Sequence, residues 1–250
     1  MKPLLTAVVF VICQTAFAAA PPKTMLWSWF AEDNFLPLAQ PGVGVAYLAL
    51  SLRFDGLDKV IPSPRLIPVR IPHETYRMAV IRFDNELDGP HRASFSPTQR
   101  ELAVNMVAEM AALAHPQAIQ IDFDAPLSAR PFYRQLLTDL RARLGPDTFL
   151  SMTSLVSWCN SESSWLSALP VNEIVPMAFY MGQSTPATVT LLQEGGQFPF
   201  AGCRDSIGLM IANNRKPEIR PHQGQRAYFF TGYTKWSADL IASALNLFQP

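Results

Sequence analysis

The stretch Ala118-Ile119-Gln120-Ile121-Asp122-Phe123-Asp124-Ala125 decides the fold, because it reads as a buried strand that ends in two acids. Alternate side chains of a strand share a face, so Asp122 and Asp124 are predicted to point one way and Ile121 and Phe123 the other. Two adjacent carboxylates each raise the cost of ionising the other, and a purely structural strand has no need of them. The pattern predicts a functional site. The alternative is a turn aspartate and a helix-approach aspartate, both solvated and inert.

Seven further segments resemble this strand. Most are continuous apolar runs of the kind found in buried parallel strands. The eight predicted strands cover residues 25–30, 43–52, 76–83, 118–123, 149–156, 173–180, 206–211 and 227–230.

Three helices are predicted between or after these strands. Ser96 and Gln99 form a capping box that begins the first helix, which ends at His115. Ser128 is placed to cap the second helix. The third runs from about residue 236 to residue 248, with its apolar residues on one stripe.

Eight strands that alternate with helices predict an α/β fold, an irregular (β/α)₈ TIM-type barrel. Residues 55–72 are punctuated by proline and residues 213–225 are polar, and neither segment has a helical period. We therefore expect some outer helices to be short or missing. A doubly wound open sheet is the alternative, but no glycine-rich turn follows the first strand.

The first 20 residues read as an export signal, with a basic Lys2, a short apolar stretch and small residues up to Ala20 that fit a cleavage site. We expect residues 1–20 to be a signal peptide and residues 21–250 to form a single domain that is periplasmic or secreted. No later apolar stretch is long enough to span a bilayer, so no transmembrane segment is predicted after signal removal. The residues before Cys13 lack the small side chain that lipoprotein processing requires.

Charge and motifs exclude several classes of partner. The 20 basic and 20 acidic residues cancel, and no cluster of lysine and arginine appears, so nucleic acid is not an expected partner. Neither a phosphate loop nor a Gly-x-Ser-x-Gly elbow is present, and no cofactor is predicted.

Cys159 and Cys203 are expected to form a disulfide, because Cys13 leaves with the signal and the remaining pair enters an oxidising compartment. Closing this loop is expected to contribute about 3 to 4 kcal/mol. The rival reading is a metal site. It is weak because none of the four histidines shows a ligand spacing with either cysteine, and no metal site is predicted.

The carboxyl ends of the strands are where a barrel of this type builds its site. Asp122 and Asp124 end the fourth predicted strand, and Arg82 and Asp84 end the third. Arg82 would hold a carboxylate ionised, while crowding of the acids would raise one pKa, which separates an acid from a base. Asp122, Asp124 and Asp84 are therefore the predicted catalytic residues and Arg82 a binding residue. For Arg82 a buried salt-bridge network is the alternative.

Four aromatic side chains are predicted to converge on the same barrel mouth. A flat ring with a polar tip suits a sugar, so a carbohydrate or another small polar ligand is the expected partner. For each ring alone, packing in the core is the alternative. The residues are Trp27, Trp29, Trp158 and Tyr180.

Several motifs resemble the bacterial domain-of-unknown-function family 3142, over most of the chain from Trp27 to Trp236. This resemblance implies an exported barrel and names no reaction. The motifs are Gln120-Ile-Asp-Phe-Asp-Ala125, Leu150-Ser-Met-Thr-Ser154, Ser157-Trp-Cys159 and Leu169-Pro-Val-Asn-Glu173.

The chain is also distantly similar to the chitinase-like family 18 glycoside hydrolases, whose pattern is Asp-x-x-Asp-x-Asp-x-Glu. The second and third acids of that pattern fall on Asp122 and Asp124. Its proton-donating Glu falls on Pro126 and its first acid on Ile119, so the standard substrate-assisted mechanism is not implied.

Three functions are compatible with these residues. The first is a glycoside hydrolase in which Asp122 and Asp124 share the acid and base roles and Asp84 or Glu86 replaces the missing donor. The second is a glycan-binding or scaffold protein that lacks the general acid. The third, a metal-dependent hydrolase, has less support because no histidine ends a strand.

Overall fold

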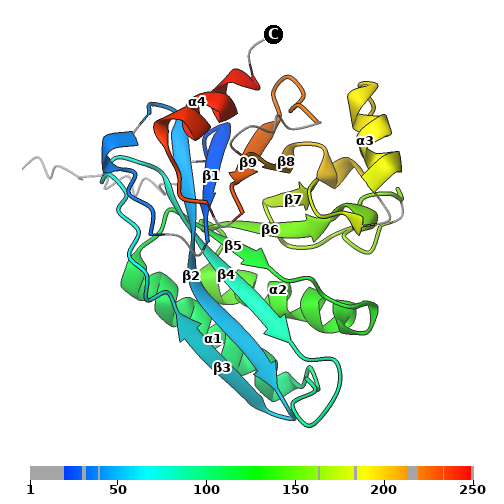
Figure 1. The fold of residues 1–250 in the computed structure, drawn as a ribbon. Helices are drawn as coiled ribbons and strands as arrows, with labels where there is room; N and C mark the ends of the chain where they lie inside the picture. Colours follow the sequence, from blue (N-terminus) through cyan, green and yellow to red (C-terminus); the bar gives the residue numbers. More distant parts are fainter. Residues whose placement is uncertain are drawn as a thin grey trace, which may run out of the picture.

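Eight parallel strands close into a barrel, as the sequence predicts (Figure 1). The computed structural model describes residues 20–29, 32–38, 40–162, 164–182, 185–212, 219–232 and 234–248. Strand β1 pairs with both β2 and β9, so the sheet has no gap and the doubly wound alternative is wrong. In barrel order the strands are β1 (Thr24–Ser28), β2 (Val43–Asp55), β4 (Arg77–Asn85), β5 (Ala118–Asp122), β6 (Phe149–Leu155), β7 (Glu173–Met177), β8 (Ser206–Met210) and β9 (Arg226–Phe230).

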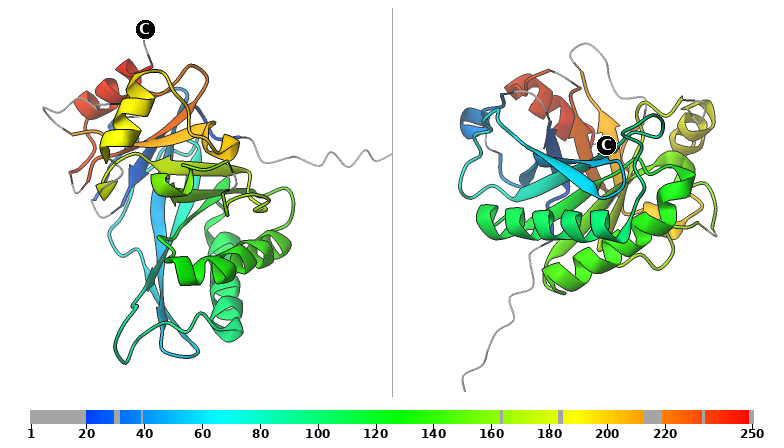
Figure 2. Two further views of the ribbon diagram at one scale, coloured as in Figure 1. Left: turned by 90° about the vertical axis from the view of Figure 1, so that its right-hand side faces the viewer. Right: turned by 90° about the horizontal axis from the view of Figure 1, so that it is seen from below.

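The outer helix layer is incomplete, as expected. Helices α1 (Pro97–Ala114) and α2 (Arg130–Leu144) lie side by side outside the barrel (Figure 2). Helices α3 (Thr185–Gln193) and α4 (Ala238–Asn246) are short. The remaining helical pieces of the described chain are single 3₁₀ turns: η1 (Leu36–Leu38), η2 (Leu127–Ala129), η3 (Val156–Trp158) and η5 (Ala201–Cys203).

The helix ends confirm one predicted cap and correct another. Ser96 accepts from the Gln99 backbone N–H, and the Gln99 side chain accepts from the Ser96 backbone, which is the predicted capping box. Helix α2 was expected to begin at a Ser128 cap. Ser128 instead lies within η2, which runs directly into α2, and no side chain caps that helix at Ala129.

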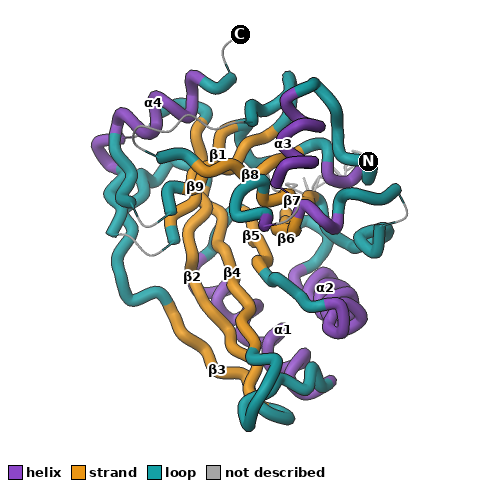
Figure 3. Tube along the Cα trace, turned by 45° about the vertical axis from the view of Figure 1, so that its right-hand side comes forward, coloured by secondary structure: helices purple, strands orange, loops and turns teal. Residues whose placement is uncertain are grey.

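Residues 55–72 contain no helix, as expected, but they include strand β3 (Lys59–Pro64), which was not predicted. It pairs antiparallel with the second half of β2 as the last strand of the sheet. Its prolines, Pro62 and Pro64, are compatible with an edge strand because one edge needs no hydrogen bonds. Strands β2, β3 and β4 together extend beyond the barrel as an arm (Figure 3).

A bulge in β2 allows this arm to form. Leu48 pairs with Val80, but Leu50 pairs with the next residue, Ile81, so Ala49 is extra. One extra residue shifts the alternation, so odd-numbered positions face the helices before the bulge and even-numbered positions face them after it. Before the bulge Val45 packs toward the outer helices, and after it Leu50 does so.

Two apolar clusters hold the barrel together, one inside it and one between the strands and the helices. Most of the core lies in the outer cluster, which covers the helix-facing side of nearly every strand. The inner cluster consists of Met25, Trp27, Ala46, Met78, Val80, Ala118, Val175 and Tyr228. Trp27 also donates to Gln120 Oε1 at 2.7 Å, which fixes the ring inside the barrel.

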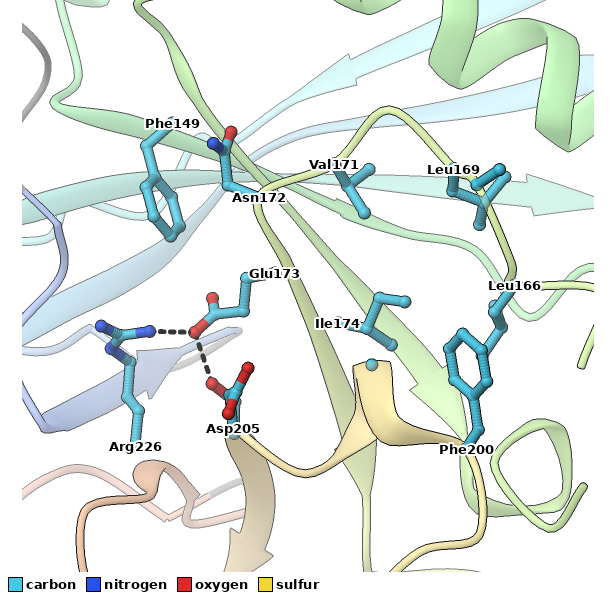
Figure 4. A pocket seen from close by; sticks show the side chains of 13 residues that line it. Phe149, Leu166, Leu169, Val171, Asn172, Glu173, Ile174, Phe200, Asp205 and Arg226 are labelled. Atoms are coloured by element: carbon cyan, nitrogen blue, oxygen red, sulfur yellow. Dashed lines mark hydrogen bonds and ion pairs between the residues drawn. The ribbon is translucent and has the colours of Figure 1, made fainter. Parts of the chain in front are cut away.

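The amino end of the barrel is closed by a network around the buried Glu173. Its carboxylate accepts from Ser151 Oγ at 2.8 Å, from Tyr228 Oη at 2.6 Å and from Ser206 Oγ, and it is paired with Arg226. A cavity of about 430 Å³ borders this network on the outside (Figure 4). Because each carboxylate oxygen has at least two donors, we assign Glu173 a role in stability.

The predicted disulfide is confirmed. Cys159 after η3 is bonded to Cys203 in η5, with 6.0 Å between the Cα atoms. The predicted signal peptide falls on residues 1–19, which lie outside the described residues, and on Ala20. In the described ranges, no helix has the length and apolar character needed to cross a bilayer.

Candidate functional site

Asp122 is the last residue of β5 and faces the inside of the barrel mouth. It is 8 % exposed and accepts a hydrogen bond from Thr153 Oγ1 of β6 at 2.6 Å. Its sequence neighbours Ile121 and Phe123 are buried in the outer cluster, on the opposite face. The alternation that the sequence predicts is therefore present at this strand end.

The pKa of Asp122 is raised to about 7, with burial as the largest cause. The charges of Asp124 and Asp84 also raise this pKa, while the hydrogen bond from Thr153 and the charge of Arg82 lower it. Asp122 is then a mixture of protonated and ionised forms near neutral pH, the state that a general acid requires.

Asp124 lies just beyond the strand and is exposed. Partial desolvation raises the pKa of its carboxyl, and the Arg82 charge opposes this rise. The two acids interact electrostatically, so their protonation states are coupled. Such a pair favours a state in which one carboxyl keeps its proton while the other is ionised.

Arg82 and Asp84 form an ion pair at the end of β4, with 2.8 Å between Arg82 Nη2 and Asp84 Oδ1. Both side chains are partly exposed, so the alternative of a buried salt-bridge network is wrong for Arg82. The Asp84 carboxylate is therefore engaged with a guanidinium at the end of β4.

The four predicted aromatic platforms are not equivalent. Trp27 is 1 % exposed inside the barrel and Trp158 is 4 % exposed against Trp165, so packing in the core is the role that the structure supports for both. Tyr180 is 74 % exposed, and Trp29 is partly buried with its ring 6.2 Å from that of Phe230. Only Tyr180 and Trp29 present ring surface to a ligand.

Two residues at the site were missed by the sequence reasoning. Thr153 could have been found, because it is a polar residue on β6, and β6 pairs with the strand that carries the acids. Tyr133 could not, because it occupies an apolar stripe of α2 and looks like a core residue. It is fully buried beside Phe123, with ring centroids 5.1 Å apart, and its hydroxyl has no hydrogen-bond partner in the described structure.

In the part of the chain that the structure describes, no group of three or more histidine, cysteine, aspartate or glutamate side chains is arranged to hold a metal ion.

Comparison with known proteins supports the fold. No family model matches the chain, and no curated protein matches it, so the resemblance to family 3142 stays a prediction. Among solved structures, the barrel is similar to a family GH18 chitinase from Chromobacterium violaceum, with a TM-score of 0.52, 11% identity and coverage of 98% of this chain and 90% of that one. It is also similar to a protein assigned as chitinase A from Streptomyces coelicolor, with a TM-score of 0.51, 11% identity and coverage of 90% and 96%. At this identity the likeness shows a chitinase-like barrel fold.

Proposed function

We propose that this protein is a glycoside hydrolase in which Asp122 is the proton donor. The observation that carries the proposal is the barrel-mouth position of Asp122, a buried carboxyl with a pKa raised to about 7 beside a second acid. Protonation of the leaving oxygen by such a group is the first requirement of glycoside hydrolysis.

Asp124 would supply the second carboxyl group, as a base that activates water or as a nucleophile. Its exposed position leaves it open to substrate, while Thr153 holds Asp122 in place. This assignment differs from the sequence expectation that Asp84 replaces the missing glutamate, because Asp84 is paired with Arg82. Arg82 would then orient the acids and contact the sugar.

The fold supports a glycan as the substrate class. Both neighbours named above are described as chitinases. Oligomers of N-acetylglucosamine are therefore the first substrates to test, followed by peptidoglycan fragments.

The test compares Asp122→Asn and Asp124→Asn with Asp88→Asn, an exposed carboxyl in the turn after β4. Reducing ends released from each glycan are measured over time. We expect both site variants to lose at least about a hundredfold of the rate, the scale of a lost general acid, and the control to keep it. Unchanged turnover in both site variants would refute the assignment.

A non-catalytic glycan-binding protein is the second candidate, and Pro126 favours it. This proline immediately precedes η2, at the position where the family 18 pattern places its donor, and its side chain carries no proton to give. Calorimetry that shows oligosaccharide binding with no product after long incubation would establish this function. Alanine at Trp29 or Tyr180 should then weaken binding more than asparagine at either acid.

We also propose that the protein is exported and that residues 21–250 fold as one unit. The signal-like residues 1–20 and the Cys159–Cys203 bond support export, because disulfides persist in oxidising compartments. Amino-terminal sequencing of protein recovered from the periplasm or the medium tests this. A chain that still begins at Met1 in the cytoplasm would contradict it.

A further inference from the structure

The structure contains a group of side-chain donors that lack acceptors, close to the acid-bearing loop. Four buried side-chain atoms have no hydrogen-bond partner within the described ranges, and three of them belong to Arg130, Tyr133 and Trp165. These atoms are Arg130 Nε, Tyr133 Oη and Trp165 Nε1. Buried donors are rarely left unpaired, so such a group indicates a missing acceptor.

The three side chains contact one another through aromatic rings. The Arg130 guanidinium lies 5.4 Å from the Trp165 ring centroid and 5.8 Å from that of Trp158. The rings of Tyr133 and Trp165 are 5.9 Å apart. Arg134 donates to the backbone carbonyl of Trp165, which fixes that loop against α2. The donors are thus held on a rigid aromatic support.

Arg130 also lacks a counter-ion, since no carboxylate in the described part of the chain pairs with it. An arginine stacked on two tryptophan rings keeps its planar fork free for an oxyanion. It is the first residue of α2, a 15-residue helix with no side-chain cap and no acid in its first turn. The backbone N–H of Arg130 already donates to the carbonyl of Leu127 in η2, so the attraction for an anion at this place comes from the guanidinium.

We propose that Arg130, Tyr133 and Trp165 bind a carboxylate of the ligand, which makes the substrate an acidic glycan. One guanidinium with two neutral donors balances a single negative charge, and this suits a carboxylate better than a dianionic phosphate. Arg130 and Trp165 are partly exposed while Tyr133 is buried, so the ligand would enter past the first two and meet Tyr133 at the back.

This inference rests on the proposed glycan function and refines its substrate class. Tyr133 packs from the helix side on Phe123, whose side chain faces away from Asp122, and the charges of both acids reach its hydroxyl. Burial above all, and then the charges of Asp122 and Asp124, raise the pKa of Tyr133, so its hydroxyl stays a donor. A carboxylate-bearing sugar held here would place a neighbouring glycosidic bond near the acids.

The experiment uses the disulfide-bonded protein and three probes of equal length: an N-acetylglucosamine oligomer, an alternating N-acetylglucosamine–glucuronate oligomer, and the methyl ester of the latter. We expect the glucuronate oligomer to bind about tenfold or more tightly than the other two. Arg130→Gln and Tyr133→Phe should remove that preference. Arg143→Gln, an exposed arginine at the other end of α2, should leave it intact.

Two readouts separate the failure of this inference from the failure of the proposed function. Equal binding of all three probes would overturn the carboxylate site and leave the glycan function standing. Glucuronate alone should shift the Trp165 indole N–H resonance downfield in the wild type and not in Arg130→Gln. Absence of that shift in the wild type refutes the site even if no oligosaccharide binds. A larger shift with inorganic phosphate would likewise refute the choice of a carboxylate.

Discussion

Arg82 of β4 lies in register with Asp122 of β5, so a guanidinium and a buried carboxyl leave neighbouring strands on the same face of the barrel. Asp84, two residues further along β4, holds Arg82 at 2.8 Å. Arg82 therefore divides its charge between an exposed acid and a buried one. This arrangement leaves burial as the dominant influence on the Asp122 pKa.

The stability of the wild type should fall as the pH rises through the range set by Asp122. Its pKa is raised from 3.8 to about 7 in the folded state, so between these values the folded protein binds more protons than the unfolded one. Asparagine resembles the protonated acid at all pH values. Asp122→Asn should thus match the wild type near pH 4 and be more stable by about 2 to 4 kcal/mol at pH 8.

Urea denaturation across this pH range measures the difference, with Asp88→Asn as the control for a lost surface charge. If the free energy of unfolding of the wild type and of Asp122→Asn depends on pH in the same way, the pKa of Asp122 is not raised by folding, and the prediction is wrong.

Turnover should require the protonated form of Asp122. The hydrolytic rate is then expected to decline above about pH 7, with a midpoint near the pKa of this group. Thr153→Val removes a hydrogen bond that favours the ionised acid, so the midpoint should move to higher pH. Rate profiles between pH 5 and pH 9 test this. If the midpoint in Thr153→Val is unshifted, the decline of the rate at high pH belongs to another group.

Removal of the disulfide should destabilise the protein by about 3 to 4 kcal/mol, because the bond closes a loop between residues 44 positions apart. The double variant Cys159→Ser/Cys203→Ser avoids a free thiol. Its melting temperature should be insensitive to reductant, while that of the wild type should fall to meet it. A wild type that is equally stable with and without reductant would mean that the bond contributes nothing.

The Glu173–Arg226 pair should be costly to break from one side only. Arg226→Met leaves a buried carboxylate without its cation, at a cost of about 3 to 5 kcal/mol. Adding Glu173→Gln removes that charge and should recover part of the loss. Chemical denaturation of the two single variants and the double variant measures the coupling energy. Additive effects would show that the two groups do not interact.

The sequence predicted the barrel because its strands are nearly continuous apolar runs, and this pattern is independent of what packs around them. It did not predict β3, because prolines are read as breakers when the edge position of a strand is unknown. The acid pair was visible because two charges at the end of an apolar run stand out. Tyr133 was hidden because a phenol in a helical apolar stripe has the same pattern as a core residue.

The aromatic residues show the same limit. Trp27 and Tyr180 both follow apolar runs, yet one lies inside the barrel and the other is open to solvent. The strand predicted over residues 173–180 ends at Met177, and Tyr180 lies in the loop beyond it with a left-handed backbone, φ 51°. An apolar run does not show where pairing with the neighbouring strand stops, so the direction of Tyr180 could not be predicted.

The extra residue Ala49 lies between the part of β2 that belongs to the barrel and the part that belongs to the arm. Deleting it would leave Leu48 opposite Val80 and Leu50 opposite Ile81 with ordinary alternation, so Leu50, Leu52 and Phe54 would keep their buried face. A one-residue deletion at Ala49 should therefore be far less damaging than one at Ser51, which would turn Leu52 and Phe54 to the opposite face. The single extra residue brings the apolar pattern of the arm into phase with that of the barrel.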